Sequence, residues 1–159
     1  MKNKLTSMPR LAVVGIGNEL CADDAVGMLI ARALLSHLTV QTSKTLMVIP
    51  AGVAVENVTG QLRGFAPDMI LLIDAAELGE APGTVRWLTM DAVTGVSALT
   101  HSLPLTMVMH YLNSELGCPV ALLGIQIKSN EMGVEMCPEV HSAAEEILAG
   151  WIEMVEKDL

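Results

Sequence analysis

The amino-acid sequence predicts an α/β fold in three layers, with a mostly parallel, twisted sheet of about five strands between helices. Two observations support this prediction. Short, almost wholly apolar runs that suit buried parallel strands recur along the chain. Longer stretches of helical composition separate them, and such alternation is typical of a sheet with right-handed crossovers. With 159 residues and no linker, repeat or low-complexity tract, residues 1–159 are expected to form a single domain.

The first half of the chain contains two strand–helix pairs. LAVVGIG at 11–17 is apolar and ends in glycine, which suits a buried strand. Residues 25–35 are rich in Ala, Leu and Met and carry one charged side chain, so we expect a helix there. LMVIP at 46–50 predicts a second strand. Residues 54–63 predict a second helix, with an acid in its first turn.

The second half adds three strands and two helices. DMILLIDA at 68–75 is the clearest strand, and GTVRWLT at 83–89 alternates in the way expected of a strand at a sheet edge. Residues 104–116 predict a helix that starts with proline, which the first turn tolerates. PVALLGIQI at 119–127 is another buried strand. Residues 138–155 form an amphipathic pattern that closes the chain as a helix.

The composition narrows the possible partners and compartments. A formal net charge of -9 argues against nucleic acid or an anionic membrane as partner. Residues 92–114 carry no Asp, Glu, Lys or Arg, but polar residues and proline interrupt them, so we expect no membrane insertion. Three cysteines without CxxC spacing do not suggest a disulfide framework. The start of the chain lacks a signal-peptide pattern, so a cytoplasmic protein is expected. The sequence does not determine the oligomeric state, for which we expect a monomer.

Four polar residues fall where ligands of such sheets bind, beyond the carboxyl ends of the strands. Asp23 and Asp24 follow the first strand, Asp74 ends the third, and His101 precedes the helix that starts at Pro104. Each has a structural alternative: the two adjacent acids can serve a helix N-terminus, Asp74 can bond a loop, and His101 can be a structural histidine. Together, the oxygens of Asp24 and Asp74 and the neutral imidazole of His101 form an incomplete shell that suits a borderline divalent ion.

Five segments, in this order, resemble the NiFe-hydrogenase maturation endopeptidases. They are GIGNELCADDAVG at 15–27, AGVAVEN at 51–57, LLIDAAELGEAPGTVR at 71–86, THSLPL at 100–105 and LLGIQ at 122–126. Together they cover most of the chain. The resemblance is closest to the type that serves formate-hydrogenlyase-like, group 4 hydrogenases.

The resemblance implies an enzyme that removes the C-terminal extension of the hydrogenase large-subunit precursor after nickel insertion. It implies that Asp24, Asp74 and His101 contact the nickel that the precursor presents, and that the isolated protein holds no permanent metal. Asp23 matches the acid before the first ligand, and it either caps the helix or orients the loop. Asp23 or Asp24 could activate the attacking water.

Three other functions are compatible with parts of the sequence. One is a metallohydrolase that holds its own zinc and acts on small amides. Another is an assembly chaperone that checks for nickel without cutting the precursor. A nucleotide-binding module is the weakest of the three, because GIGN at 15–18 lacks the third glycine of a dinucleotide fingerprint and no acid is placed for a ribose contact.

Overall fold

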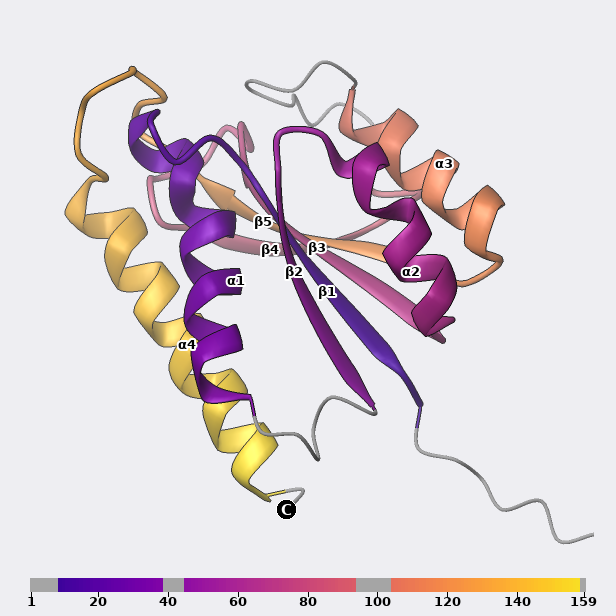
Figure 1. Ribbon diagram of the computed structural model, residues 1–159. Coiled ribbons are helices and arrows are strands. Elements are labelled where there is room, and N and C mark those ends of the chain that lie inside the picture. The colour runs from indigo at the N-terminus through magenta and orange to yellow at the C-terminus, as the bar shows by residue number, and fades with distance from the viewer. Residues whose placement is uncertain (1–8, 39–44, 94–103, 158–159) are drawn as a thin grey trace, which may run out of the picture.

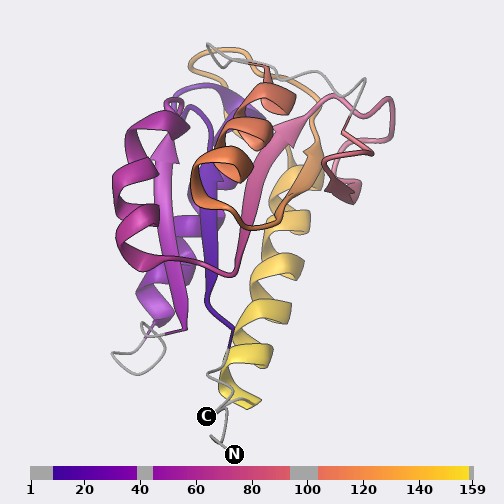
Figure 2. The ribbon, with the colours of Figure 1, turned by 90° about the vertical axis from the view of Figure 1, so that its right-hand side faces the viewer.

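The computed structural model of the chain describes residues 9–38, 45–93 and 104–157. Figure 1 shows a central sheet with helices on both faces, and Figure 2 shows the same layers from the side. The predicted three-layer α/β fold is confirmed. In the described ranges, no helix is long and apolar enough to cross a bilayer.

The sheet has five strands in the order β2-β1-β3-β5-β4. They are β1 (Leu11–Ile16), β2 (Leu46–Gly52), β3 (Met69–Ala76), β4 (Val85–Thr89) and β5 (Val120–Gln126). The four apolar strands run parallel to one another, and β4 pairs antiparallel with β5 at one edge. The alternating pattern at 83–89 therefore predicted the edge position correctly.

Each face of the sheet is covered by one pair of helices (Figure 1). The helices are η1 (Ala22–Ala25), α1 (Val26–His37), η3 (Val55–Val58), α2 (Thr59–Phe65), α3 (Leu105–Leu116) and α4 (Pro138–Lys157). Helices α1 and α4 contact each other on one face, and α2 and α3 do so on the other. Two predicted helices begin differently, because the short 3-10 turns η1 and η3 precede α1 and α2.

The alternation of β3 divides its side chains between two apolar cores. Ile70 and Leu72 belong to the core under α2 and α3, whereas Leu71 and Ile73 belong to the core under α1 and α4. Because successive residues of a strand point to opposite faces, Asp74 continues the row of Ile70 and Leu72. Asp74 therefore lies on the face of the sheet that α2 and α3 cover.

Candidate active site

Two buried carboxylates lie at the carboxyl edge of the sheet. Asp24 belongs to η1, which follows β1, and Asp74 lies near the end of β3. Strands β1 and β3 are neighbours in the sheet, and η1 contacts β3 directly. Both residues have a solvent-exposed fraction of 0%. The structure thus brings these two predicted site residues to the same edge of the sheet.

Glycines allow the start of α1 to approach the two strands closely. A Cβ atom added to Gly27 would stand 2.3 Å from the carbonyl oxygens of both Ile16 and Ile73. One added to Gly17 would stand 1.9 Å from the carbonyl oxygen of Asp24, and Gly17 has a φ of 145° that disfavours other residues. The glycine spacing in GIGNELCADDAVG therefore has a direct cause: it lets the backbone that carries Asp24 lie against the sheet.

A backbone N–H group of the turn after β1 binds the Asp24 carboxylate. The N–H of Asn18 donates to Asp24 Oδ2 at 2.9 Å, and Asn18 Oδ1 in turn accepts the N–H of Leu20 at 3.0 Å. Asp24 is therefore fixed by the loop that leads into η1. Because Asp24 is buried, a nearby cation would interact strongly with its carboxylate.

Asp23 points to a different partner, the segment after β5. Its Oδ2 accepts the N–H groups of Lys128 at 2.8 Å and Ser129 at 3.0 Å, and its Oδ1 accepts the N–H of Cys137 at 2.7 Å. The Cys137 thiol donates to Oδ2 at 3.4 Å. Of the two roles expected for Asp23, the helix cap is wrong, because neither η1 nor α1 has a side-chain cap and α1 begins after Ala25. Asp23 instead orients the loop.

This bonding separates the two adjacent acids in chemical role. The Asp23 carboxylate accepts four hydrogen bonds, so little of its capacity is left to take a proton from water. Asp24 is fully buried at the edge of the sheet that it shares with Asp74, so it is the candidate for a base or a ligand. Burial raises the pKa of the Cys137 thiol, and the Asp23 carboxylate raises it further. The thiol therefore stays protonated and acts as the donor in its hydrogen bond to Asp23.

Replacing Asp23 by asparagine is expected to lower the free energy of unfolding at pH 7 by about 3 kcal/mol, because charge-assisted bonds are lost inside the protein. Burial alone would raise the pKa of Asp23, but the backbone N–H bonds from Cys137, Ser129 and Lys128 outweigh it and lower the pKa. The stabilisation is thus present above the unfolded-state pKa of about 3.9 and is lost as the pH falls through the lower folded-state value.

Urea unfolding of wild type and Asp23→Asn at several pH values between neutral and acidic measures this difference. We expect the gap between the two free energies to narrow as the pH falls. A gap that stays constant would show that the charge of Asp23 does not contribute.

Gln126, the last residue of β5, lies at the same edge of the sheet as Asp74 and was given no role from the sequence. Its side chain is buried, and its Oε1 accepts the N–H groups of Leu78 at 2.6 Å and Glu80 at 3.3 Å. Its Nε2 donates to Glu77 Oε1 at 3.0 Å and to the carbonyl of Ile127 at 2.8 Å. The sequence feature that could have indicated this role is a lone amide at the end of an apolar run, because a buried amide needs several hydrogen-bond partners.

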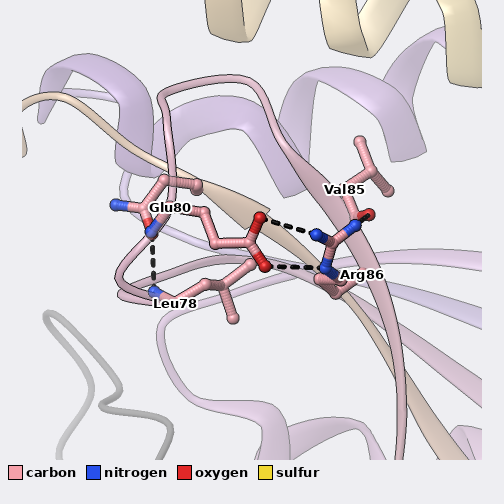
Figure 3. A network of polar contacts seen from close by, with 5 residues as sticks. Leu78, Glu80, Val85 and Arg86 are labelled. Carbon is pink, nitrogen blue, oxygen red and sulfur yellow. Dashed lines mark hydrogen bonds and ion pairs between the residues drawn. The ribbon is translucent and has the colours of Figure 1, made fainter.

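The loop between β3 and β4 is thereby tied to the end of β5. Figure 3 shows the same loop closed by Glu80 and Arg86, whose two nitrogen–oxygen contacts measure 2.7 Å and 2.6 Å. Both side chains of this ion pair are partly exposed, so the pair helps to set the conformation of the loop but contributes little to stability. The loop after Asp74 is consequently held in one position next to the candidate site.

His101, the third predicted ligand, lies outside the described residues. The described chain resumes at Pro104, directly before α3. Among the residues that the structure describes, no group of three or more His, Cys, Asp or Glu is arranged to hold a metal ion. Of the three predicted ligands, the described residues include Asp24 and Asp74, and the ligand role of all three stays a prediction.

Comparisons with known proteins identify relatives along nearly the whole chain. A family model described as hydrogenase maturation protease matches residues 29–157. A predicted hydrogenase maturation protease of Methanocaldococcus jannaschii is 32% identical over 162 residues, which cover 98% of this chain and 94% of the relative. The hydrogenase 3 maturation protease of Escherichia coli is 29% identical over 140 residues, 86% of each chain. The crystal structure of a NiFe hydrogenase maturation protease from Thermococcus kodakarensis superposes with a TM-score of 0.82 at 26% identity, covering 95% of both chains.

Proposed function

Since this chain belongs to the NiFe-hydrogenase maturation protease family, we propose that it is a nickel-dependent endopeptidase. Its substrate in this proposal is the precursor of a hydrogenase large subunit, from which it removes the C-terminal extension after nickel insertion. The nickel is part of the substrate, and it is recognised through Asp24, Asp74 and His101.

The observation that supports this proposal best is the burial of two carboxylates at one edge of the sheet. Asp24 and Asp74 are both fully buried, although an ionised carboxylate is costly to remove from water. A divalent cation brought by a substrate lowers this cost. Carboxylate oxygens together with an imidazole nitrogen suit a borderline ion such as nickel.

The reaction is the hydrolysis of one peptide bond. The contact of Asp24, Asp74 and His101 with the bound nickel places the scissile bond at the sheet edge. Water attacks the carbonyl carbon, and the Asp24 carboxylate accepts the proton that the water loses. This proton then passes to the leaving nitrogen as the carbon–nitrogen bond breaks. Asp23 and Gln126 hold the loops around this edge and do not exchange protons in this scheme.

The test compares the cognate precursor in matched nickel-loaded and nickel-free forms. Each form is mixed with the purified protein, and its intact mass is followed over time. We expect a C-terminal peptide to be lost from the loaded form alone. Equal cleavage of both forms would show that nickel is not the signal.

Two further outcomes point to the alternative functions. Binding of the loaded precursor without any change of mass would favour the assembly chaperone. Stoichiometric zinc in the freshly purified protein, with cleavage of small amides, would favour a metallohydrolase with its own metal. Metal analysis and mass measurement on the same preparation therefore separate the three functions.

A further inference from the structure

Two loops beside the candidate active site expose apolar side chains. Met132 and Leu20 have exposed fractions of 69% and 67%, the largest among the large apolar residues that the structure describes. Val134, at 45%, lies in the same loop as Met132. Leu20 precedes η1, and Met132 and Val134 lie between β5 and α4. We call these three residues the apolar patch.

A backbone hydrogen bond joins the two halves of the apolar patch. The N–H of Gly133 donates to the carbonyl oxygen of Leu20 at 2.8 Å, which places Leu20 beside the turn that carries Met132 and Val134. Figures 1 and 2 both show the loop between β5 and α4 lying next to the start of η1. The patch is therefore formed by segments more than a hundred positions apart in the sequence.

The Asp23 carboxylate fixes this arrangement from inside. Its bonds to Lys128, Ser129 and Cys137 hold both ends of the loop that contains the patch, and the N–H of Asp23 donates to the carbonyl of Ser129 at 3.1 Å. A surface whose backbone is already fixed loses little entropy when a partner binds. Exposed apolar side chains on such a rigid support are typical of docking sites.

The charges around the apolar patch indicate the chemistry of its partner. The loop carries Glu131 and Glu135, both exposed, and Glu139 follows at the start of α4. Lys128 is the one basic residue between positions 127 and 139. Glu131 and Glu135 form no ion pair with another described residue, so their charges are available to an approaching basic surface.

We propose that the apolar patch docks a segment of the hydrogenase precursor that combines apolar with lysine or arginine side chains. This inference rests on the proposed function, because it names where the same substrate is held. Leu20 lies four positions before Asp24, so a segment seated on the patch is anchored next to the candidate site. The patch supplies affinity independently of nickel.

The test uses nickel-free precursor, in which neither nickel contact nor cleavage contributes to binding. Fluorescence anisotropy gives its Kd for wild type, Leu20→Ser and Met132→Ser. We expect each substitution to raise the Kd by about tenfold, as for a central apolar contact. The double variant Glu131→Gln with Glu135→Gln is expected to raise the Kd about threefold at low salt and to flatten its salt dependence.

Leu35→Ser and Met154→Ser are the matched controls. Both residues are exposed apolar side chains, at 41% and 54%, on the later turns of α1 and α4, away from the candidate site. They are expected to leave the Kd unchanged, and the Tm of every variant shows that it folds.

Three results would overturn the docking proposal. One is an unchanged Kd in Leu20→Ser and Met132→Ser, and another is the absence of measurable binding between wild type and nickel-free precursor. The third is that the patch binds a second copy of the chain. Sedimentation would then show a dimer, and Met132→Ser would dissociate this dimer without altering the Kd for the precursor. Cleavage of nickel-loaded precursor is scored separately, so the failure of the proposed function is distinguishable from the failure of docking.

Discussion

Replacing Asp24 by asparagine is expected to lower the rate of precursor cleavage by about a thousandfold, within the range of a lost general base, and Asp74→Asn is expected to lower it comparably through the loss of a nickel contact. Asparagine retains an oxygen that can accept the Asn18 N–H, but it carries no charge for the nickel and cannot take a proton from water. His101→Ala is expected to have a comparable effect through the loss of a nickel ligand. Mass spectrometry of nickel-loaded precursor over time measures all three variants.

Asp68→Asn provides the matched control for this experiment. Asp68 is exposed and precedes β3, whereas Asp74 is buried near the other end of the same strand. Its Oδ2 accepts the N–H of Arg10 at 2.6 Å, a bond that an asparagine oxygen can also accept. We expect normal cleavage by this variant. Normal cleavage by Asp24→Asn, Asp74→Asn or His101→Ala would refute the assignment of the residue concerned.

Replacing Gly27 by alanine is expected to lower the free energy of unfolding by about 3 kcal/mol, the upper part of the range for overpacking. The new Cβ would stand 2.3 Å from two backbone carbonyl oxygens, those of Ile16 and Ile73. Backbone atoms of two central strands cannot rotate away as a side chain can, so α1 must move outward. For a chain of this size the change corresponds to a fall in Tm of roughly 9 °C.

Gly150→Ala tests whether this cost comes from the close contact and not from the loss of a helical glycine. Gly150 lies inside α4, and a Cβ added there would meet no atom within 4 Å apart from its chain neighbours and the backbone of its own helix. Alanine is favoured over glycine in a helix, so this variant is expected to gain up to about 1 kcal/mol. Thermal unfolding followed by circular dichroism gives both values. Equal effects in the two variants would contradict the close-contact argument.

Displacement of α1 would also move the residues just before it. Asp24 lies three positions before Gly27, and the same close approach holds η1 against β3. We therefore expect folded Gly27→Ala protein to cleave the precursor more slowly than wild type. The glycines of the first motif thus link the stability of the fold to the position of the candidate site.

The strands and most helices could be predicted because each has a local signal. MILLI in β3 is apolar on both faces because helices cover both sides of the sheet, and such a run has few alternatives. The edge strand β4 was predictable for the opposite reason, since polar residues interrupt its apolar ones and all of its residues are partly or fully exposed. The 3-10 turns η1 and η3 were not predicted, because one short turn before a helix carries no separate pattern.

The sequence by itself determined the order in which strands and helices follow one another along the chain. It also placed Asp24 and Asp74 at one edge of the sheet. The resemblance assigned Asp23 and Asp24 different roles, but only the tertiary structure showed which partners the Asp23 side chain has and that it orients a loop and caps no helix. The donors that engage Asp23 are backbone N–H groups of Lys128, Ser129 and Cys137, at least 105 positions away along the chain. Nearly every residue has a backbone N–H, whatever its side chain, so the sequence does not indicate which N–H groups will bind a given carboxylate. That depends on the folded structure.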